Sequence, residues 1–593
     1  MALKTRLLHT SLALVIASLA ACSGAPRATG AGAAAPQTRA AQSAAAAYDF
    51  GMDIFHPVAA RQGMVASEQA LASAIGLDML QRGGNAVDAA VAVGFALAVA
   101  LPNAGNLGGG GFMMVHDARS GHSVALDFRE TAPAGATRGM YLDARGKVID
   151  GKSLYTHYAV GVPGTVAGLA HALQRWGSLP LAQVVAPAAE LADKGFVVSP
   201  TLARVLAREK KTLAPWPASQ AIFWNHGAPL AQGERLVQKD LAASLRLIGE
   251  QGAKAFYEGA IAQKIAAEMA AHAGAITLAD LKNYRVIERE PVRGSYRGHE
   301  VVAMPPPSSG GVHLVQMLHI LERWPLAAWG AGSAQAIHHM AEAMKLAYAD
   351  RAEYLGDPGF VQVPLKGLTS KRYADTLAAT IHPTQARTAK DIGPGKPQPY
   401  ESEQTTHYSV VDQAGNAVAV TYTLNTNFGS GIVARGTGIL LNNEMDDFSA
   451  KPGVANAYGL VGGDANAVAA GKRPLSSMTP TLVLKDGKPV LVTGSPGGAR
   501  IITTVLQTVV NTIDHGMNPL EAAATPRFHH QWTPDELRVE KGFSADTLAL
   551  LRQWGHHLAL KPAMGRTQTI QIRGGMLYGA SDPRNPDGQT LGY

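Results

Sequence analysis

The stretch "ESEQTTHYSVVDQAGNAVAVTYTLN", residues 401–425, holds two runs of alternating and β-branched residues around a short polar turn, which predicts a β-hairpin. Two threonines, Thr405 and Thr406, stand where the first strand begins. A threonine hydroxyl is a weak nucleophile until a base takes its proton. If the chain is cut before one of them, the freed α-amino group has a pKa of about 7.7–8.0 and can be that base. These residues alone leave open which threonine becomes the new terminus.

The length of the turn decides which residue faces Thr405. With a three-residue loop at residues 413–415, Thr405 lies opposite Thr423. Directly paired residues have Cβ atoms about 4.5–5.5 Å apart, so a second hydroxyl would lie beside the first and could orient it. A four-residue loop would place Tyr422 there instead.

The segments on either side of the hairpin predict a layered fold. Residues 386–404 are polar and rich in Pro and Gly, which predicts an exposed, mobile segment where a cut could occur. Before it the periodicity is mostly helical, with a buried core helix expected over residues 86–101. After it, residues 479–495 read as strands and residues 499–516 as a helix. Strands between long helices predict an α/β protein with a mostly antiparallel central sheet.

Composition excludes one large class of function. The chain has 593 residues, of which 47% are hydrophobic and 16% are charged. That is ample for a large buried core. The net charge of +7 is spread along the chain without blocks of Lys and Arg. We therefore expect a globular protein that binds no nucleic acid.

The N-terminus predicts export. Lys4 and Arg6 precede an apolar run that ends at Ala21 and is too short to span a membrane, so residues 1–21 are expected to be a signal peptide. Its end, "LAAC", resembles the lipobox of bacterial lipoproteins, and Cys22 is the only cysteine of the chain. We expect lipid attachment at Cys22 rather than a buried thiol, and no intrachain disulfide.

Residues 22–47 hold little but Ala, Gly, Pro, Gln and Thr and predict a flexible tether. The residue after Cys22 is Ser23 rather than Asp, which by the same resemblance implies the outer membrane and a periplasmic location. Loss of residues 1–21 would remove Lys4 and Arg6 and no acid, leaving a net charge of +5.

Five motifs together carry a resemblance to a known family. They are the hairpin itself, "DFRE" (127–130), "LLNNEMDDFS" (440–449), "KRPLSSMTPT" (472–481) and "GSPGGARIITTVLQ" (494–507). From about residue 50 onward the chain resembles the γ-glutamyltranspeptidases, N-terminal-nucleophile hydrolases that cut themselves in two. The resemblance implies a four-layer αββα sandwich of the α/β (α+β) class. It also implies cleavage between Gln404 and Thr405, into a large subunit, 48–404, and a small catalytic subunit, 405–593, that form one intertwined domain.

The resemblance also implies catalytic roles. Thr405 would be the nucleophile, with Thr423 as its supporting hydroxyl. The backbone N–H groups of Gly497 and Gly498 would stabilise the oxyanion. Without the family, "SPGG" would simply be a turn.

A γ-glutamyl substrate carries an α-carboxylate and an α-ammonium, so its site needs a fixed cation and a fixed anion. The resemblance assigns the carboxylate to Arg129, Ser476 and Ser477, and the ammonium to Asn425, Glu444 and Asp447. Without the resemblance, Arg129 would be interpreted as an ion-pair partner of Asp127 or Glu130. Asp446 and Asp447 would be interpreted as a solvated acidic pair. Residues 451–463 resemble the family's lid loop, with Tyr458 as its gate.

No cofactor and no metal is expected. The histidine pairs 338/339, 529/530 and 556/557 are adjacent in sequence and lack the i, i+4 spacing of a helical metal site. The expected reaction takes a γ-glutamyl group from glutathione or a related compound and passes it to water, an amino acid or a peptide. A cephalosporin (glutaryl) acylase of the same superfamily and a non-catalytic lipid-anchored binding protein are the alternatives.

Overall fold

The computed structural model describes residues 51–393, 405–451 and 463–593. Contacts place residues 48–593 in one compact unit. Within the described part of the chain, no helix combines the length and the apolar character that crossing a bilayer requires. The predicted signal peptide and tether, together with Cys22, lie outside the described residues.

Two seven-stranded sheets form the centre of the fold, and every pairing within them is antiparallel. The first sheet contains, in order, β23 (Gln589–Gly592), β2 (Met64–Ser67), β12 (Thr406–Val411), β13 (Ala417–Thr423), β3 (Gly110–Asp117), β4 (His122–Phe128) and β9 (Ile287–Arg289). The second contains β1 (Val58–Ala60), β22 (Met576–Ser581), β21 (Gln568–Arg573), β17 (Lys488–Thr493), β16 (Thr481–Lys485), β11 (His299–Ala303) and β10 (Val292–Tyr296).

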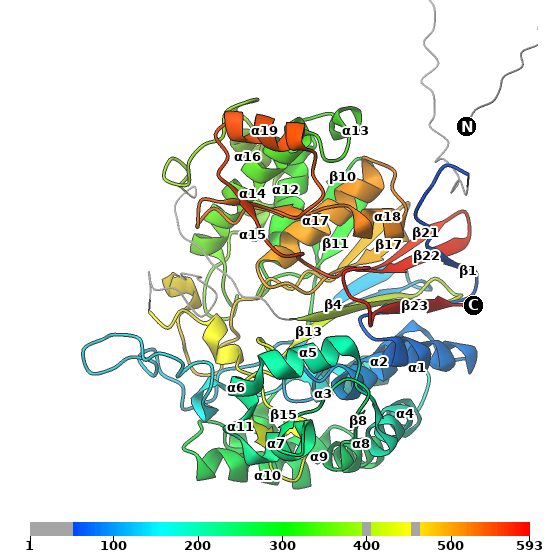
Figure 1. The fold of residues 1–593 in the computed structure, drawn as a ribbon, viewed down its shortest axis with the longest axis vertical. Coiled ribbons are helices and arrows are strands. Elements are labelled where there is room, and N and C mark those ends of the chain that lie inside the picture. Colours follow the sequence, from blue (N-terminus) through cyan, green and yellow to red (C-terminus); the bar gives the residue numbers. More distant parts are fainter. Residues whose placement is uncertain (1–50, 394–404, 452–462) are drawn as a thin grey trace, which may run out of the picture. The chain divides into compact units, whose positions relative to one another are not determined.

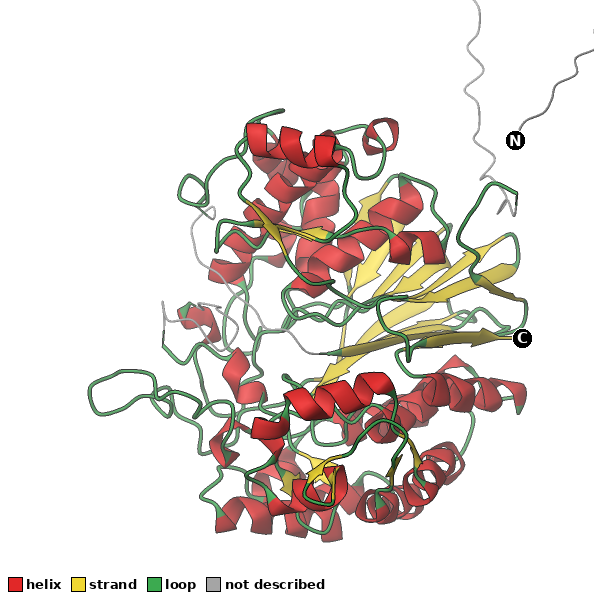
Figure 2. Cartoon of the chain, in the orientation of Figure 1, coloured by secondary structure: helices red, strands yellow, loops and turns green. Residues whose placement is uncertain are grey.

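Helices cover the outer face of each sheet, as Figures 1 and 2 show. The first sheet is covered by α1 (Ala70–Gln81), α2 (Ala86–Ala100), α3 (Thr165–Trp176), α4 (Leu181–Lys194), α5 (Pro200–Arg208), α6 (Lys210–Leu213), α7 (Pro217–Phe223), α8 (Lys239–Gln251), α9 (Lys254–Tyr257), α10 (Ala260–Ala271) and α11 (Leu278–Asn283). The second is covered by α12 (Gly310–Leu321), α13 (Leu326–Trp329), α14 (Ala334–Tyr354), α15 (Leu365–Leu368), α16 (Lys371–Ala378), α17 (Arg500–Ile513), α18 (Pro519–Ala524) and α19 (Ala545–Gln553).

Shorter elements complete the described fold. They are the strand pairs β5 (Phe196–Val197) with β8 (Arg235–Leu236), β6 (Trp224–Asn225) with β7 (Ala228–Pro229) and β14 (Val433–Ala434) with β15 (Ile439–Leu440), the three-stranded β18 (Phe528–His529), β19 (Leu537–Val539) and β20 (Leu558–Leu560), and the 3₁₀ turns η1 (His157–Ala159), η2 (Glu444–Asp447) and η3 (Asp464–Asn466).

The sides of β3 show why the chain forms four layers. Met113 and Val115 pack with α1–α11 in one hydrophobic cluster, whereas Phe112 and Met114 pack in the other, which includes the second sheet. Successive side chains of a strand point to opposite faces, so both faces of this strand are buried. The order helices, sheet, sheet, helices is the predicted αββα sandwich, and the prediction is confirmed.

The hairpin has the register that a three-residue loop predicts. Thr406 pairs with Tyr422 and Val411 with Ala417, the Asp412 N–H donates to the Asn416 carbonyl at 3.1 Å, and Gly415 has a φ of +87°. The same register carried back by one residue places Thr405 opposite Thr423. The alternative with Tyr422 opposite Thr405 is therefore wrong.

Two further expectations have clear outcomes. The buried core helix expected over residues 86–101 is α2, whose fifteen residues are all buried and whose first turn is closed by a capping box between Asn85 and Asp88.

The segment expected to be exposed from residue 386 is held in place over its first part, because Ile392 is buried and the Trp532 indole donates to two carbonyls of this stretch, both at 2.8 Å. Residues 394–404 lie outside the described part.

Candidate active site

Thr405 lies at the entrance of β12 and is buried, with 4% of its surface exposed. Thr423 is the last residue of β13 and pairs with Gly110 on its other side. Its Oγ accepts the Asn425 N–H at 2.8 Å, and the Asn425 side chain donates to the Asn443 carbonyl at 3.0 Å. These bonds tie β13, which pairs with the strand that follows Thr405, to the segment that carries Glu444.

The glycine run that starts β3 lets this strand approach the site. The glycines at 108–111 do not have a positive φ. They are therefore needed for space and not for a left-handed conformation. A Cβ added to Gly109 would lie 2.0 Å from the Thr423 carbonyl oxygen. A Cβ on Gly110 would lie 2.7 Å from a Glu130 oxygen, so Glu130 lies directly beside the residue that pairs with Thr423.

Gly497 and Gly498 form the turn between β17 and α17, with φ values of +137° and +58°. These values favour glycine, because other residues are strained there. The turn packs against the nucleophile strand, since a Cβ on Gly494 would lie 2.4 Å from the His407 ring. The segment that leads from β17 to the predicted oxyanion donors therefore passes beside β12, and the role of Gly497 and Gly498 stays a prediction.

His407, two residues after Thr405, is not an acid or base of the site. It is fully buried, and burial lowers its pKa to about 3. Its ring nitrogens lie 2.8 Å from the Thr421 Oγ1 and 3.1 Å from the Ser409 Oγ. It is a neutral side chain that fixes the strand.

The predicted substrate residues Arg129, Glu444 and Asp447 form one buried cluster, called the clamp below. The Arg129 guanidinium is 1% exposed and pairs through Nη1 with Glu444 and through Nη2 with Asp447 at 2.5 Å. Burial alone would lower the Arg129 pKa, but Glu444, Asp447 and Glu130 outweigh it and raise that pKa above its ordinary value. The cation therefore stays charged at any physiological pH.

Of the two alternative ion-pair partners of Arg129, Glu130 is confirmed at 3.7 Å, whereas Asp127 is wrong. The Asp127 carboxylate is taken by Arg473 and Arg289, each at 2.7 Å. The interpretation of residues 446 and 447 as a solvated acidic pair is also wrong, because Asp446 is 4% exposed and accepts a hydrogen bond from the Ser153 hydroxyl at 2.6 Å.

Glu130 is a buried carboxylate of the site that the sequence analysis considered only as a neighbour of Arg129. It lies 3.7 Å from the Arg129 guanidinium, and neither of its oxygens has a hydrogen-bond partner in the described part of the chain. Burial raises its pKa to about 7, against the opposing charge of Arg129. Its signal in the sequence is an acid directly beside the arginine of "DFRE".

Ser476 and Ser477 lie on a buried segment that passes the clamp. The carbonyls of Pro474 and Leu475 accept from Arg129 at 3.3 and 3.4 Å. The Ser477 hydroxyl lies 3.2 Å from the Arg351 guanidinium. Of the remaining predicted residues, Gln404 and Tyr458 lie outside the described part of the chain, as Cys22 does.

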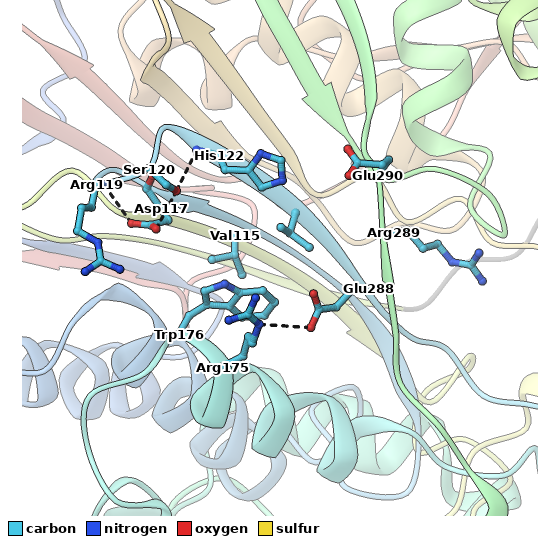
Figure 3. A pocket seen from close by; sticks show the side chains of 11 residues that line it. Val115, Asp117, Arg119, Ser120, His122, Arg175, Trp176, Glu288, Arg289 and Glu290 are labelled. Atoms are coloured by element: carbon cyan, nitrogen blue, oxygen red, sulfur yellow. Dashed lines mark hydrogen bonds and ion pairs between the residues drawn. The ribbon is translucent and has the colours of Figure 1, made fainter.

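A pocket of about 400 Å³ lies at the far end of β3 and β4 (Figure 3). Asp117 and His122, at the turn between these strands, line it, and Arg175 faces Glu288 across it at 3.8 Å. The strand rises about 3.3 Å per residue, so roughly 20 Å separate this turn from Gly110. None of the predicted site residues lines this pocket.

The described residues include two groups with metal-ligand chemistry, which the adjacent histidine pairs did not indicate. One is His157, Glu268 and His272, and the other is His338, Glu342 and His556. Each contains a Glu and a His four residues apart, and the third member comes from a distant part of the chain. The i, i+4 spacing was present in the sequence, but only folding brings in the third ligand.

The comparisons with known proteins agree with this geometry. The family model described as Gamma-glutamyltranspeptidase matches residues 72–592. The glutathione hydrolase proenzyme of Escherichia coli (strain K12) is 60% identical over 543 residues, covering 91% of this chain and 93% of that protein. The chain belongs to the γ-glutamyltranspeptidase family.

Solved structures of similar proteins support the fold. The crystal structure of cephalosporin acylase from Bacillus halodurans is 31% identical, with a TM-score of 0.81, and covers 92% of this chain and 99% of that one. The crystal structure of Helicobacter pylori γ-glutamyltranspeptidase is 46% identical, with a TM-score of 0.55, and covers 56% of this chain and 95% of that one. The family is one of enzymes, so the comparisons do not support the alternative of a non-catalytic binding protein.

Proposed function

We propose that this protein is a γ-glutamyltransferase and glutathione hydrolase that activates itself by cutting its own chain between Gln404 and Thr405. The observation that carries the proposal is the clamp of one arginine and two carboxylates. It lies beside the hairpin of β12 and β13, where Thr405 precedes β12 and Thr423 ends β13. The similarity to glutathione hydrolase proenzymes supports it.

Self-cleavage needs no outside reagent except water. The Thr405 hydroxyl attacks the Gln404 carbonyl, the peptide C–N bond breaks and an ester forms between the two residues. Water then hydrolyses the ester, which leaves a carboxylate on Gln404 and a free α-amino group on Thr405. The Helicobacter pylori structure supports a two-chain product, because its matched chain spans 56% of this one.

Turnover uses the group that cleavage releases. The α-amine of Thr405 takes the proton of its own hydroxyl, and the Oγ attacks the γ-carbonyl of the donor. The N–H groups of Gly497 and Gly498 stabilise the oxyanion. The amine leaving group departs with a proton, and water or an amino-acid or peptide amine then takes the γ-glutamyl group.

The clamp recognises the glutamyl end by exchanging ion pairs. In the described structure Arg129 is bound to Glu444 and Asp447. A γ-glutamyl donor brings one carboxylate and one ammonium, so Arg129 can pass from its protein partners to the donor carboxylate while Glu444 and Asp447 take the ammonium. Every buried charge stays paired, which keeps the cost of desolvation low.

A denaturing gel with intact masses tests the proposal. We expect two fragments from the wild type, the smaller beginning Thr-Thr-His-Tyr, and one uncut, inactive chain from Thr405→Ala. An uncut wild-type chain indistinguishable from the variant would support the non-catalytic binding protein instead.

The cephalosporin acylase alternative rests on the likeness of the whole chain to the Bacillus halodurans enzyme. A glutaryl group has no α-ammonium, so it would not use Glu444 and Asp447. We expect higher kcat/KM on γ-glutamyl-p-nitroanilide than on a glutaryl cephalosporin. The reverse order would overturn the substrate assignment and leave self-cleavage intact.

We also propose export and attachment to the outer membrane, facing the periplasm, through a lipid on Cys22. The basis is the "LAAC" tetrapeptide and the unique cysteine. Fractionation of cells that carry the wild type or Cys22→Ala tests this. We expect the variant to leave the membrane fraction, and unchanged attachment would contradict lipidation.

A further inference from the structure

The strongest cluster of side chains without a role in the proposed reaction lies among the helices that cover the first sheet. It is formed where the C-terminal end of α10 meets the turn η1. Glu268 in the last turn of α10 and His272 just after it face His157 of η1. The Glu268 Oε1 lies 3.3 Å from the His157 Nε2 and 3.2 Å from the His272 Nδ1. Two imidazoles thus converge on a single carboxylate oxygen.

These separations suit a small divalent ion. Two ligands that each lie about 2.0–2.2 Å from a tetrahedral ion are about 3.3–3.6 Å apart. All three ligand atoms lie within 4.8 Å of one another. Imidazole nitrogen with one carboxylate is the ligand set of Zn²⁺ and its first-row neighbours, not of Mg²⁺ or Ca²⁺.

The three side chains differ in how far they are buried. His157 and Glu268 are 3% and 6% exposed, while His272 is 36% exposed. The two rings are stacked, with centroids 4.4 Å apart and planes 6° from parallel. The exposed His272 is therefore the ring that can adjust to an ion, which would replace the 3.0 Å contact between its Nδ1 and the Glu268 carbonyl.

The second histidine group shows what makes the first one suitable. There the Glu342 Oε1 is bound by the Lys345 ammonium at 2.7 Å, and its other oxygen lies 3.4 Å from Arg387. Fixed cations already occupy that carboxylate. At Glu268 the Oε1 faces only imidazoles among the described contacts, and Arg435 lies 3.3 Å from the other oxygen on a side chain that is 70% exposed.

We propose that His157, Glu268 and His272 form a binding site for a divalent transition-metal ion of the Zn²⁺ class. An ion here would join α10 to η1, directly after the loop that contains Ser153 and Leu154. That loop supports the clamp, because the Leu154 carbonyl accepts from the Asn443 side chain at 3.2 Å and Ser153 donates to Asp446. The site is independent of the proposed reaction.

Zn²⁺ titration by calorimetry tests the site, with self-processed protein freed of any affinity tag and stripped with a chelator. We expect one tight site in the wild type and about a hundredfold weaker binding, or none, in His272→Ala and in Glu268→Gln. His171→Ala is the matched control, because His171 is also 36% exposed and lies 2.8 Å from a glutamate, but has no second histidine at that carboxylate. It should bind Zn²⁺ like the wild type.

Thermal melting gives a second readout. Because an ion that binds only the folded state stabilises it by mass action, Zn²⁺ should raise the Tm of the wild type and of His171→Ala but not that of His272→Ala. Without Zn²⁺ the Tm of His272→Ala should match the wild type, which shows that this exposed substitution leaves the fold intact. Equal Zn²⁺ affinity in the wild type, His272→Ala and Glu268→Gln, or no binding by the wild type, would overturn the proposal.

Discussion

At the scale of single side chains, the clamp concentrates charge where water is excluded. Arg129 and Glu444 are each 1% exposed, and Asp447 is 14% exposed. A buried ion pair adds little net stability, but removal of one partner leaves an unpaired buried charge. The geometry of Arg129 should therefore matter for both binding and folding, and lysine cannot reproduce its two-sided contacts.

Arg129→Lys should lower kcat/KM for γ-glutamyl-p-nitroanilide roughly a hundredfold, mainly through KM, since each charge-assisted hydrogen bond contributes about 1.5–3 kcal/mol. Self-cleavage should persist, because the clamp binds the glutamyl end and not the scissile bond. Steady-state kinetics and a denaturing gel measure the two effects. Arg138→Lys is the control, since Arg138 is 63% exposed and its ion pair is on the surface. An unchanged KM in Arg129→Lys would contradict the assignment.

Glu130 gives a prediction for pH. Its pKa in the folded protein is raised from 4.5 to about 7 by burial. Between these values the unfolded chain has released the proton while the folded protein still holds it, so the free energy of unfolding falls as pH rises. At 1.36 kcal/mol per pKa unit the loss amounts to about 3 kcal/mol.

Glu130→Gln should remove this loss. Melting curves at pH 5 to 8 should show the Tm of the wild type falling relative to the variant up to about pH 7, then running parallel. Glu300→Gln, at an exposed glutamate paired with Arg293, should follow the wild type throughout. Parallel curves for the wild type and Glu130→Gln from pH 5 would show that Glu130 ionises normally.

At the scale of elements, the approach of β3 to β13 depends on a glycine. Gly109→Ala would place a Cβ 2.0 Å from the Thr423 carbonyl oxygen, which is backbone and cannot turn aside. We expect a loss of 1–3 kcal/mol or more in stability and little self-cleavage, because Thr423 is displaced from Thr405. Gly135→Ala is the control, since nothing lies within 4 Å of its added Cβ. Melting and gels measure both, and wild-type cleavage in Gly109→Ala would contradict this role.

Elements also show what the sequence can and cannot predict. Local rules predict α2 and limit the hairpin to two registers, because turn length and periodicity act over a few residues, and the structure decides between the two registers. The pairing of Arg129 with Glu444 does not, since 315 positions separate them and only the stacking of layers brings them together. The resemblance named both residues as substrate ligands, but it gave no indication that they bind each other. Glu268 and His157 remained unnoticed for the same reason.

At the scale of the whole molecule, the proposed cut falls inside a shared architecture. The strands β12 and β13 of the proposed small subunit lie between β2 and β3 of the proposed large subunit, and β16 pairs with β11. Neither fragment alone could complete a sheet or bury both faces of its strands. Cleavage should leave the folded protein intact and change only what happens after unfolding.

Refolding should therefore separate the cut protein from the uncut one. Both fragments should co-elute on size exclusion in native buffer. After dilution from denaturant, Thr405→Ala should regain its fold independently of concentration below the aggregation range, because its parts remain tethered. The processed wild type should recover poorly at low concentration and better as concentration rises, since its two fragments must first meet. Circular dichroism and size exclusion measure the recovery. Concentration-independent refolding of the processed protein, or fragments that part without denaturant, would contradict the intertwined two-subunit domain.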